Sequence, residues 1–198
     1  MLKSLAAVTI ATALAACQSG ADQVPSARIS VGVIDSLEVT QSFGGVSGSA
    51  GIDDYSNVQF DLGLTTRGED GLPRARASVE LGLTRFGGEG LDVDATEIAV
   101  GGRFYGGALG EGTRPIQPFG LAQALFTIAD VQGVDLGTQV GGRIGGGLQF
   151  PISDQVFFDV IADYTIPFVG GQVDLAGVGT LETEYSGLAI RFGLGFTF

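Results

Sequence analysis

Apolar and polar residues alternate with a period of two along most of the chain beyond residue 28. Between Ile29 and Phe43 the odd positions are mainly apolar, and the even positions are mainly serine, glycine, threonine or glutamate. Such a period places successive side chains on opposite faces of a β-strand. The same alternation returns in seven further segments, 57–65, 74–83, 97–105, 118–128, 138–150, 155–168 and 184–198. The sequence therefore predicts eight strands.

The segment 118–128 is the one that departs from this alternation. Phe119, Leu121 and Leu125 share a face with Gln123. The register of this fifth strand therefore stays open. Pro118 has no N–H group to give to a neighbouring strand, so it predicts a bulge or a sheet edge nearby.

The two faces of the predicted strands differ in size and charge. One face is built from large apolar residues, and the other carries glycine, hydroxyl, amide and charged side chains. A soluble lipocalin-like barrel fits poorly, because its interior would have to be built from the polar set. An apolar exterior around a polar interior is typical of transmembrane barrels, and runs of about ten residues are long enough to cross a bilayer. We expect an all-β fold, an antiparallel up-and-down transmembrane β-barrel of about eight strands over residues 28–198.

The connections fit eight crossings that start from a periplasmic N-terminus. The expected outer segments are 44–53, 86–94, 130–137 and 169–183, and the expected inner ones are 67–73, 106–114 and 151–154. The outer segments are somewhat longer overall. An even number of crossings returns Phe198 to the periplasmic side.

The N-terminus has the pattern of an export signal. Lys3 precedes an apolar run over residues 5–16 that ends in small side chains. This run is well short of the ~20 residues that a spanning helix needs, so we expect it to be removed.

The last residues of that run, Leu-Ala-Ala-Cys ending at Cys17, resemble the lipobox of bacterial lipoproteins. The resemblance implies a lipoprotein signal peptide over residues 1–16 and a mature chain acylated at Cys17, with palmitate among its acyl groups. Gln18 follows where an aspartate would retain the protein in the inner membrane, so the resemblance implies an outer-membrane protein that is lipid-anchored at Cys17. The alternative is an ordinary signal peptide beside an incidental free cysteine.

Residues 17–27 are expected to form the acylated N-terminus and a flexible tether. The stretch after the cysteine is small and polar and contains one proline. Ten extended residues reach at most roughly 33 to 36 Å. A lipid on Cys17 would therefore stay close to the barrel.

Composition narrows the class of protein further. The 34 glycines among 198 residues follow no collagen-like period, and the apolar fraction of 44% is too high for disorder. The net charge is −12, which disfavours binding to nucleic acid because that binding depends on clustered cations. The chain has a single cysteine, so it can form no internal disulfide.

The final residues carry a second resemblance. The ending GLAIRFGLGFTF resembles the terminal strand of small Gram-negative outer-membrane barrels of the OmpA/OmpX type, including the final Phe198 as the barrel C-terminal signal. GGGLQFPISDQVFFDVIADY resembles the preceding hairpin, although the chain lacks the tryptophans of the interfacial belts. The resemblance implies a monomer whose partners are outer-membrane lipid, lipopolysaccharide, the lipoprotein-processing machinery and the barrel-assembly machinery.

Catalysis finds little support in the sequence. The chain has no histidine, which excludes Ser-His-Asp and Cys-His arrangements. Asp159 and Asp163 share a strand face, but four residues along a strand separate them by roughly 13 Å, too far for a glycosidase pair. We therefore expect no enzyme and no cofactor.

Charged residues at lumen positions are the main candidate site. They are Glu38, Asp61, Arg74, Arg76, Glu80, Glu97, Arg103, Arg143, Asp159, Asp163 and Arg191. An eight-stranded barrel is just wide enough inside for side chains, so these groups are expected to pair and plug it. We expect a structural or surface-interaction role. The alternatives are a narrow channel for small solutes and a soluble lipid-anchored β-domain.

The expected outer loops are acidic. Their carboxylates are Asp53, Asp54, Glu89, Asp92, Asp94, Asp130, Asp135, Asp174 and Glu182. Oxygen clusters suit Ca²⁺ or Mg²⁺, but no EF-hand or other ligand spacing occurs. We expect a solvated acidic surface and no metal site.

Overall fold

The computed structural model describes residues 22–198 except 53, 89–90, 111, 132–133 and 176–178. The expected signal peptide, Cys17 and residues 18–21 of the expected tether lie outside the described residues, as do Asp53 and Glu89. The side chains of Asp54, Asp92, Asp135 and Asp174 also lie outside the description. Among the described residues there is no helix long and apolar enough to cross a membrane.

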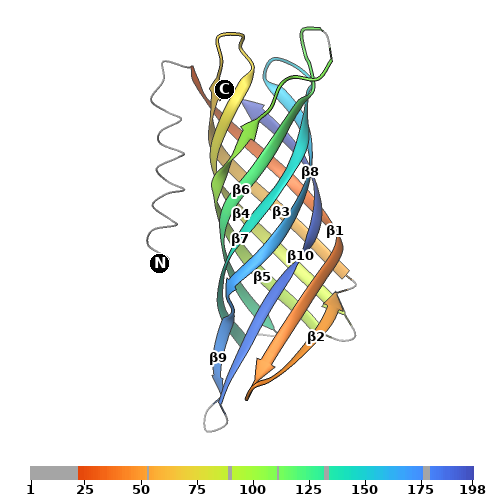
Figure 1. Ribbon diagram of the computed structural model, residues 1–198, viewed down its shortest axis with the longest axis vertical. Coiled ribbons are helices and arrows are strands. Elements are labelled where there is room, and N and C mark those ends of the chain that lie inside the picture. Colours follow the sequence, from red (N-terminus) through yellow and green to blue (C-terminus); the bar gives the residue numbers. More distant parts are fainter. Residues whose placement is uncertain (1–21, 53, 89–90, 111, 132–133, 176–178) are drawn as a thin grey trace.

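The described chain is a closed antiparallel barrel (Figure 1). Its strands are β1 (Gln23–Phe43), β2 (Val46–Ile52), β3 (Asp54–Arg67), β4 (Pro73–Gly88), β5 (Leu91–Tyr105), β6 (Gln117–Val131), β7 (Val134–Pro151), β8 (Val156–Val169), β9 (Gly171–Leu175) and β10 (Gly179–Thr197). The wall strands pair in the order β1, β3, β4, β5, β6, β7, β8 and β10, and β1 pairs with β10 to close the wall. β2 and β3 pair with successive stretches of β1 in the same register. β8 and β9 likewise pair with successive stretches of β10. The wall therefore has the eight strands that the alternation predicts.

Large apolar side chains cover the outside of this wall. The exposed ones include Ile29, Val31, Val33, Val58, Phe60, Leu62, Leu64, Val79, Leu81, Leu83, Ile98, Phe104, Phe126, Ile128, Ile144, Leu148, Tyr164, Phe168, Ile190, Phe192, Leu194 and Phe196. We call this set the apolar belt. Each of the eight wall strands contributes to it. The opposite, buried face is mostly polar, which is the inverse of a soluble barrel.

A β-bulge in β1 marks one edge of the apolar belt. The pairing with β10 shifts between Ile34 and Ser36. Before the bulge Val33 points outward, whereas after it Glu38 is exposed and Val39 packs inside against Tyr185 and its neighbours. The expectation that Glu38 faces the lumen is therefore wrong, because one extra residue exchanges the two faces of the strand.

The barrel wall begins earlier than expected. β1 starts at Gln23, and its first residues pair with β3 on one side and with β10 on the other. Ser26 is buried and accepts a hydrogen bond from Arg76 Nε at 2.9 Å. Residues 23–27 therefore belong to the wall and not to a tether. At the other terminus Phe198 is 74% exposed, and its N–H donates to the Pro25 carbonyl at 3.0 Å.

The structure fixes the register of the fifth strand, β6. Phe119, Leu121, Gln123 and Leu125 all point inward and are at most 6% exposed. The bulge lies near the far end of the strand, between Ile128 and Asp130, and Pro118 pairs regularly with Leu148. The expectation of a bulge or an edge at Pro118 is therefore wrong.

A small sheet projects past one end of the barrel, at the bottom of Figure 1. It consists of β2, the end of β1, the start of β10, and β9, in this order. We call it the protruding sheet. β1 and β2 meet in a two-residue turn at Gly44 and Gly45, whose φ angles of 58° and 82° suit a tight hairpin. Much of the expected outer loops 44–53 and 169–183 is therefore strand.

Candidate functional site

The centre of the barrel holds a balanced set of charged side chains. Five arginines face five carboxylates, each residue at most 3% exposed: Arg28, Arg76, Arg103, Arg143 and Arg191 with Asp61, Glu80, Glu97, Asp159 and Asp163. We call these ten residues the lumen network. They come from seven of the eight wall strands, β1, β3, β4, β5, β7, β8 and β10. Equal numbers of cations and anions let the buried charges neutralise one another.

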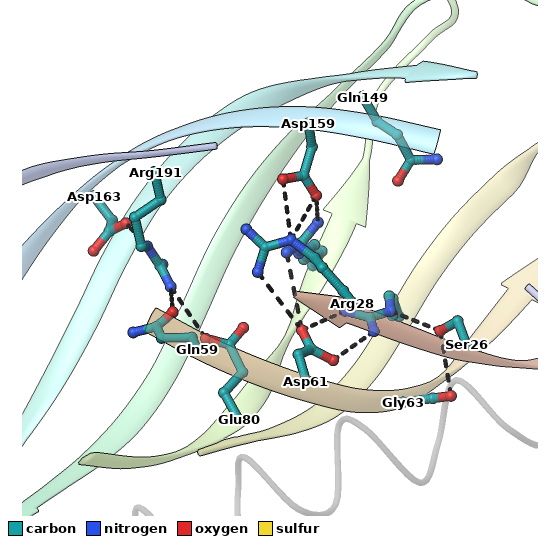
Figure 2. A network of polar contacts seen from close by, with 12 residues as sticks. Ser26, Arg28, Gln59, Asp61, Gly63, Glu80, Gln149, Asp159, Asp163 and Arg191 are labelled. Atoms are coloured by element: carbon teal, nitrogen blue, oxygen red, sulfur yellow. Dashed lines mark hydrogen bonds and ion pairs between the residues drawn. The ribbon is translucent and has the colours of Figure 1, made fainter. Parts of the chain in front are cut away.

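One half of the lumen network gathers three arginines around two aspartates. Arg76 holds Asp61 with two hydrogen bonds, of 2.6 and 2.5 Å. Asp159 accepts from Arg28 Nε at 3.0 Å and from Arg103 Nη1 at 2.7 Å. Figure 2 shows Arg28 reaching across the lumen between the two aspartates. Such charge-assisted pairs are stronger than neutral hydrogen bonds.

The other half has three carboxylates and two arginines. Arg191 Nε donates to Asp163 at 2.6 Å, and its Nη1 contacts Glu80 at 3.1 Å and also donates to Gln59 (Figure 2). Arg143 contacts Glu97 at 2.7 Å and Asp163 at 3.2 Å. This half carries one excess negative charge and the first half one excess positive charge. The two halves therefore neutralise each other only when both are complete.

Apolar side chains lie beside the lumen network and beyond one of its ends. Next to Arg103, the ring of Phe119 lies 4.7 Å from its guanidinium carbon and packs in a cluster of Phe119, Leu121, Ile161 and Tyr105. Toward the protruding sheet, a second cluster contains Val93, Ala95, Ala129 and Tyr185, with Val39, Tyr55 and Leu136 against it. The charges thus have apolar neighbours on the β6 and β8 side of the lumen and at one end, in the low-dielectric setting where an unpaired charge is costly.

Gly193 makes room for one of the central ion pairs. It lies on β10 opposite Asp159 of β8. A Cβ atom at this position would clash with Arg28 Nε and with the Asp159 carboxylate. The strand can pass this point only without a side chain, which gives one glycine of the lumen face a definite function.

Nine of the eleven residues expected in the lumen lie in the lumen network, and Glu38 and Arg74 do not. Arg74 pairs with Asp70 at 2.7 Å at the barrel end, and both side chains are about half exposed. It stands at the start of β4, beside the turn, where the lumen opens to solvent, so its expected lumen position is wrong. Arg28 was missed, because the barrel was expected to start there. Its even residue number places Arg28 on the same face of β1 as Ser30 and Gly32, so the alternation of side chains could have identified it.

A side chain closes one gap in the wall. β10 pairs with β8 up to Gly187 and with β9 from Thr183. Between these stretches, residues 184–186 of β10 do not pair with residues 166–170, which join the two strands. Gln139 of β7 reaches across this gap. Its amide accepts from the Tyr185 N–H at 2.9 Å and donates to the Tyr185 carbonyl at 3.1 Å. The Gln139 amide thus replaces the peptide group of a missing strand partner.

We expect Gln139→Leu to lower the free energy of unfolding by about 1 to 3 kcal/mol, because two buried backbone groups would lose their partner. Urea titration of the refolded barrel measures this. Gln123→Leu is the matched control, since neither amide atom of the buried Gln123 has a hydrogen-bond partner among the described residues. Equal losses in the two variants would show that the Gln139 amide does not hold the gap closed.

Comparisons with known proteins identify the fold. No family model and no curated protein matches the chain. Among solved structures, the chain is similar to Neisserial surface protein A (NspA), with 15% identity, a TM-score of 0.52, and 88% of this chain and 97% of that one covered. It is also similar to the outer membrane protein OprG from Pseudomonas aeruginosa, with 13% identity, a TM-score of 0.53, and 90% and 96% covered. At these identities the likeness shows the barrel fold alone.

Proposed function

We propose that the protein is a non-catalytic outer-membrane barrel with a sealed lumen, which serves a structural or surface-interaction role. The observation that carries the proposal is the lumen network, which together with two clusters of buried apolar side chains fills the barrel with paired charges. Such an interior is a plug. A plugged lumen is more consistent with a structural barrel than with a channel for solutes.

The outer surface supports a place in a membrane. The apolar belt runs around every wall strand, and polar residues take over the same face at the end with the protruding sheet. On β10 the outward positions change from Leu188 to Ser186 and Glu184. On neighbouring strands Arg85 and Asp94 form an exposed ion pair of 3.2 Å beyond the belt at this same end. An apolar band with polar margins is typical of transmembrane barrels.

The protruding sheet supports the surface-interaction part of the proposal. β2 pairs with β1 along one edge, and among the described residues no strand pairs with its other edge. Its sequence, VSGSAGI, has no charge and no proline. Proteins usually protect a free edge with charged residues or proline, because an open edge can pair with a further strand. This edge could therefore accept an extended segment of a partner.

Planar-bilayer recording of the refolded protein tests the sealed lumen. We expect no conductance steps, because ion pairs and apolar side chains occupy the interior. Arg74→Gln is a control, since Arg74 lies at the barrel end outside the lumen network. Reproducible open steps from the wild-type protein would contradict the plug and favour the alternative, a narrow channel for small solutes.

We also propose that the acyl group on Cys17 tethers the N-terminus at the periplasmic leaflet. β1 starts at Gln23, so residues 18–22 would separate the lipid from the wall, a reach of roughly 17 Å. The barrel needs no further anchor. Cys17→Ser, combined with an ordinary signal-peptidase site, should therefore leave the protein in the membrane fraction. Release into the soluble fraction would instead support a soluble lipid-anchored β-domain.

A further inference from the structure

A cavity of about 200 Å³ opens at the barrel end that carries the C-terminus, at the top of Figure 1. The turn between β3 and β4, the loop between β5 and β6 and the turn between β7 and β8 surround it. It lies outside the lumen network, and the proposed plug does not use it.

The charge of the cavity is opposite to that of the chain. Among the residues that the structure describes, Arg67 and Arg114 line it together with one carboxylate, Asp154. The Asp154 side chain is 95% exposed, so it screens the two guanidinium groups weakly. The described lining therefore has one excess positive charge in a chain whose net charge is −12.

Arg67 is the cation in this lining that lacks a counterion. Every other arginine of the described chain has a carboxylate within 4.0 Å, whereas Arg67 forms no ion pair with any described carboxylate. Its Nη2 donates to the hydroxyl of Thr197 at 3.3 Å, a neutral and rather distant acceptor. Guanidinium groups favour the two oxygens of a carboxylate, so Arg67 can take an anionic ligand.

The rest of the lining suits the neutral part of a small organic anion. Phe157 is 5% exposed and lines the cavity together with Val156. Tyr105 also contributes, with its hydroxyl donating to Gln149 at 2.9 Å. A few polar groups beside an apolar wall are usual in ligand pockets.

We propose that this cavity binds a small carboxylate, with Arg67 as its main ion-pair partner and the apolar part of the ligand against Phe157 and Val156. A single negative charge matches the single excess positive charge of the lining, whereas a phosphate dianion would exceed it. The carboxylate can come from a free organic acid or from the C-terminus of a peptide.

The test uses N-acetylalanine as the probe and N-acetylalaninamide, its neutral counterpart, as the control ligand. Amide chemical shifts of the full-length protein refolded in micelles are followed by NMR. We expect the acid alone to give saturable shifts at Gly71, Thr113 and Gln155, which line the cavity. An equal response to the amide, or no saturable response to the acid at millimolar concentrations, would overturn the proposal.

The arginine variants locate the site. Arg67→Gln should weaken binding of N-acetylalanine about tenfold, the effect of losing one charged hydrogen bond. Arg74→Gln should leave it unchanged, because Arg74 lies at the same end but does not line the cavity. Both variants should still migrate as folded barrels on unboiled gels. Unchanged binding in a folded Arg67→Gln protein would refute the assignment.

A peptide with a free C-terminus, compared with its amidated form, identifies the source of the carboxylate. Tighter binding of the free peptide than of N-acetylalanine would support a partner's C-terminus as the ligand. Binding of N-acetylalanine alone would support a free organic acid. The Arg67→Gln loss is expected in either case, and it does not depend on whether the lumen conducts.

Discussion

Asp159→Asn is expected to lower the free energy of unfolding by about 3 to 5 kcal/mol, because it leaves buried arginines without a counterion. Asp159 is fully buried and pairs with both Arg28 and Arg103. Without it, three guanidinium groups of this half would face Asp61 alone. Urea unfolding of the barrel in lipid vesicles, followed by fluorescence or gel migration, measures the loss.

Asp70→Asn is the matched control for this prediction. Asp70 also pairs with an arginine at 2.7 Å, but its side chain is 45% exposed. Exposed ion pairs contribute about 0 to 1 kcal/mol, so this variant should be nearly as stable as the wild type. If Asp159→Asn cost no more than Asp70→Asn, the lumen network would not be the stabilising centre of the barrel.

Gly193→Val should destabilise the barrel by a similar amount, about 3 to 5 kcal/mol. The new side chain would occupy the position of Arg28 Nε and the Asp159 carboxylate. Either the ion pair separates or β10 moves away from β8, and both outcomes break buried contacts. We expect a lower urea midpoint and a smaller folded fraction on unboiled gels.

Gly120→Ala tests whether the effect is local. Gly120 is exposed on β6, and a Cβ there would meet nothing closer than the Gly145 carbonyl at 4.0 Å. This variant should fold as well as the wild type. A Gly193→Val protein with wild-type stability would mean that the Arg28 and Asp159 pair can relocate freely, against the account given above.

The alternation of side chains was enough to predict much of this barrel. A period of two gave the eight wall strands, the apolar outside and the lumen positions of Arg76, Arg103, Arg143 and Arg191. The prediction succeeds because one face of a transmembrane wall contacts lipid and the other faces the polar lumen. The alternation within each strand therefore shows which residues face outward and which face inward.

Features that depend on neighbouring strands were not predictable in this way. The bulge in β1 inserts one residue and moves Glu38 outside, and nothing in the local sequence requires it. The pairing of Arg28 with Asp159 joins residues 131 positions apart, so it depends on closure and register. The hydrogen bonds between Gln139 and Tyr185 depend on the gap between β10 and the strands β8 and β9, which appears only in the assembled wall.

The central claim, that the apolar belt faces lipid, is tested most directly by nitroxide labels along β10. Single cysteines at Ile190, Phe192 and Leu194, in a Cys17→Ser background and reconstituted bilayers, should be accessible to oxygen and protected from a water-soluble nickel complex. A label at Glu184, beyond the belt, should be accessible to the nickel complex. If the complex reached Phe192 as readily as Glu184, this face would be in water and the protein would not be a transmembrane barrel.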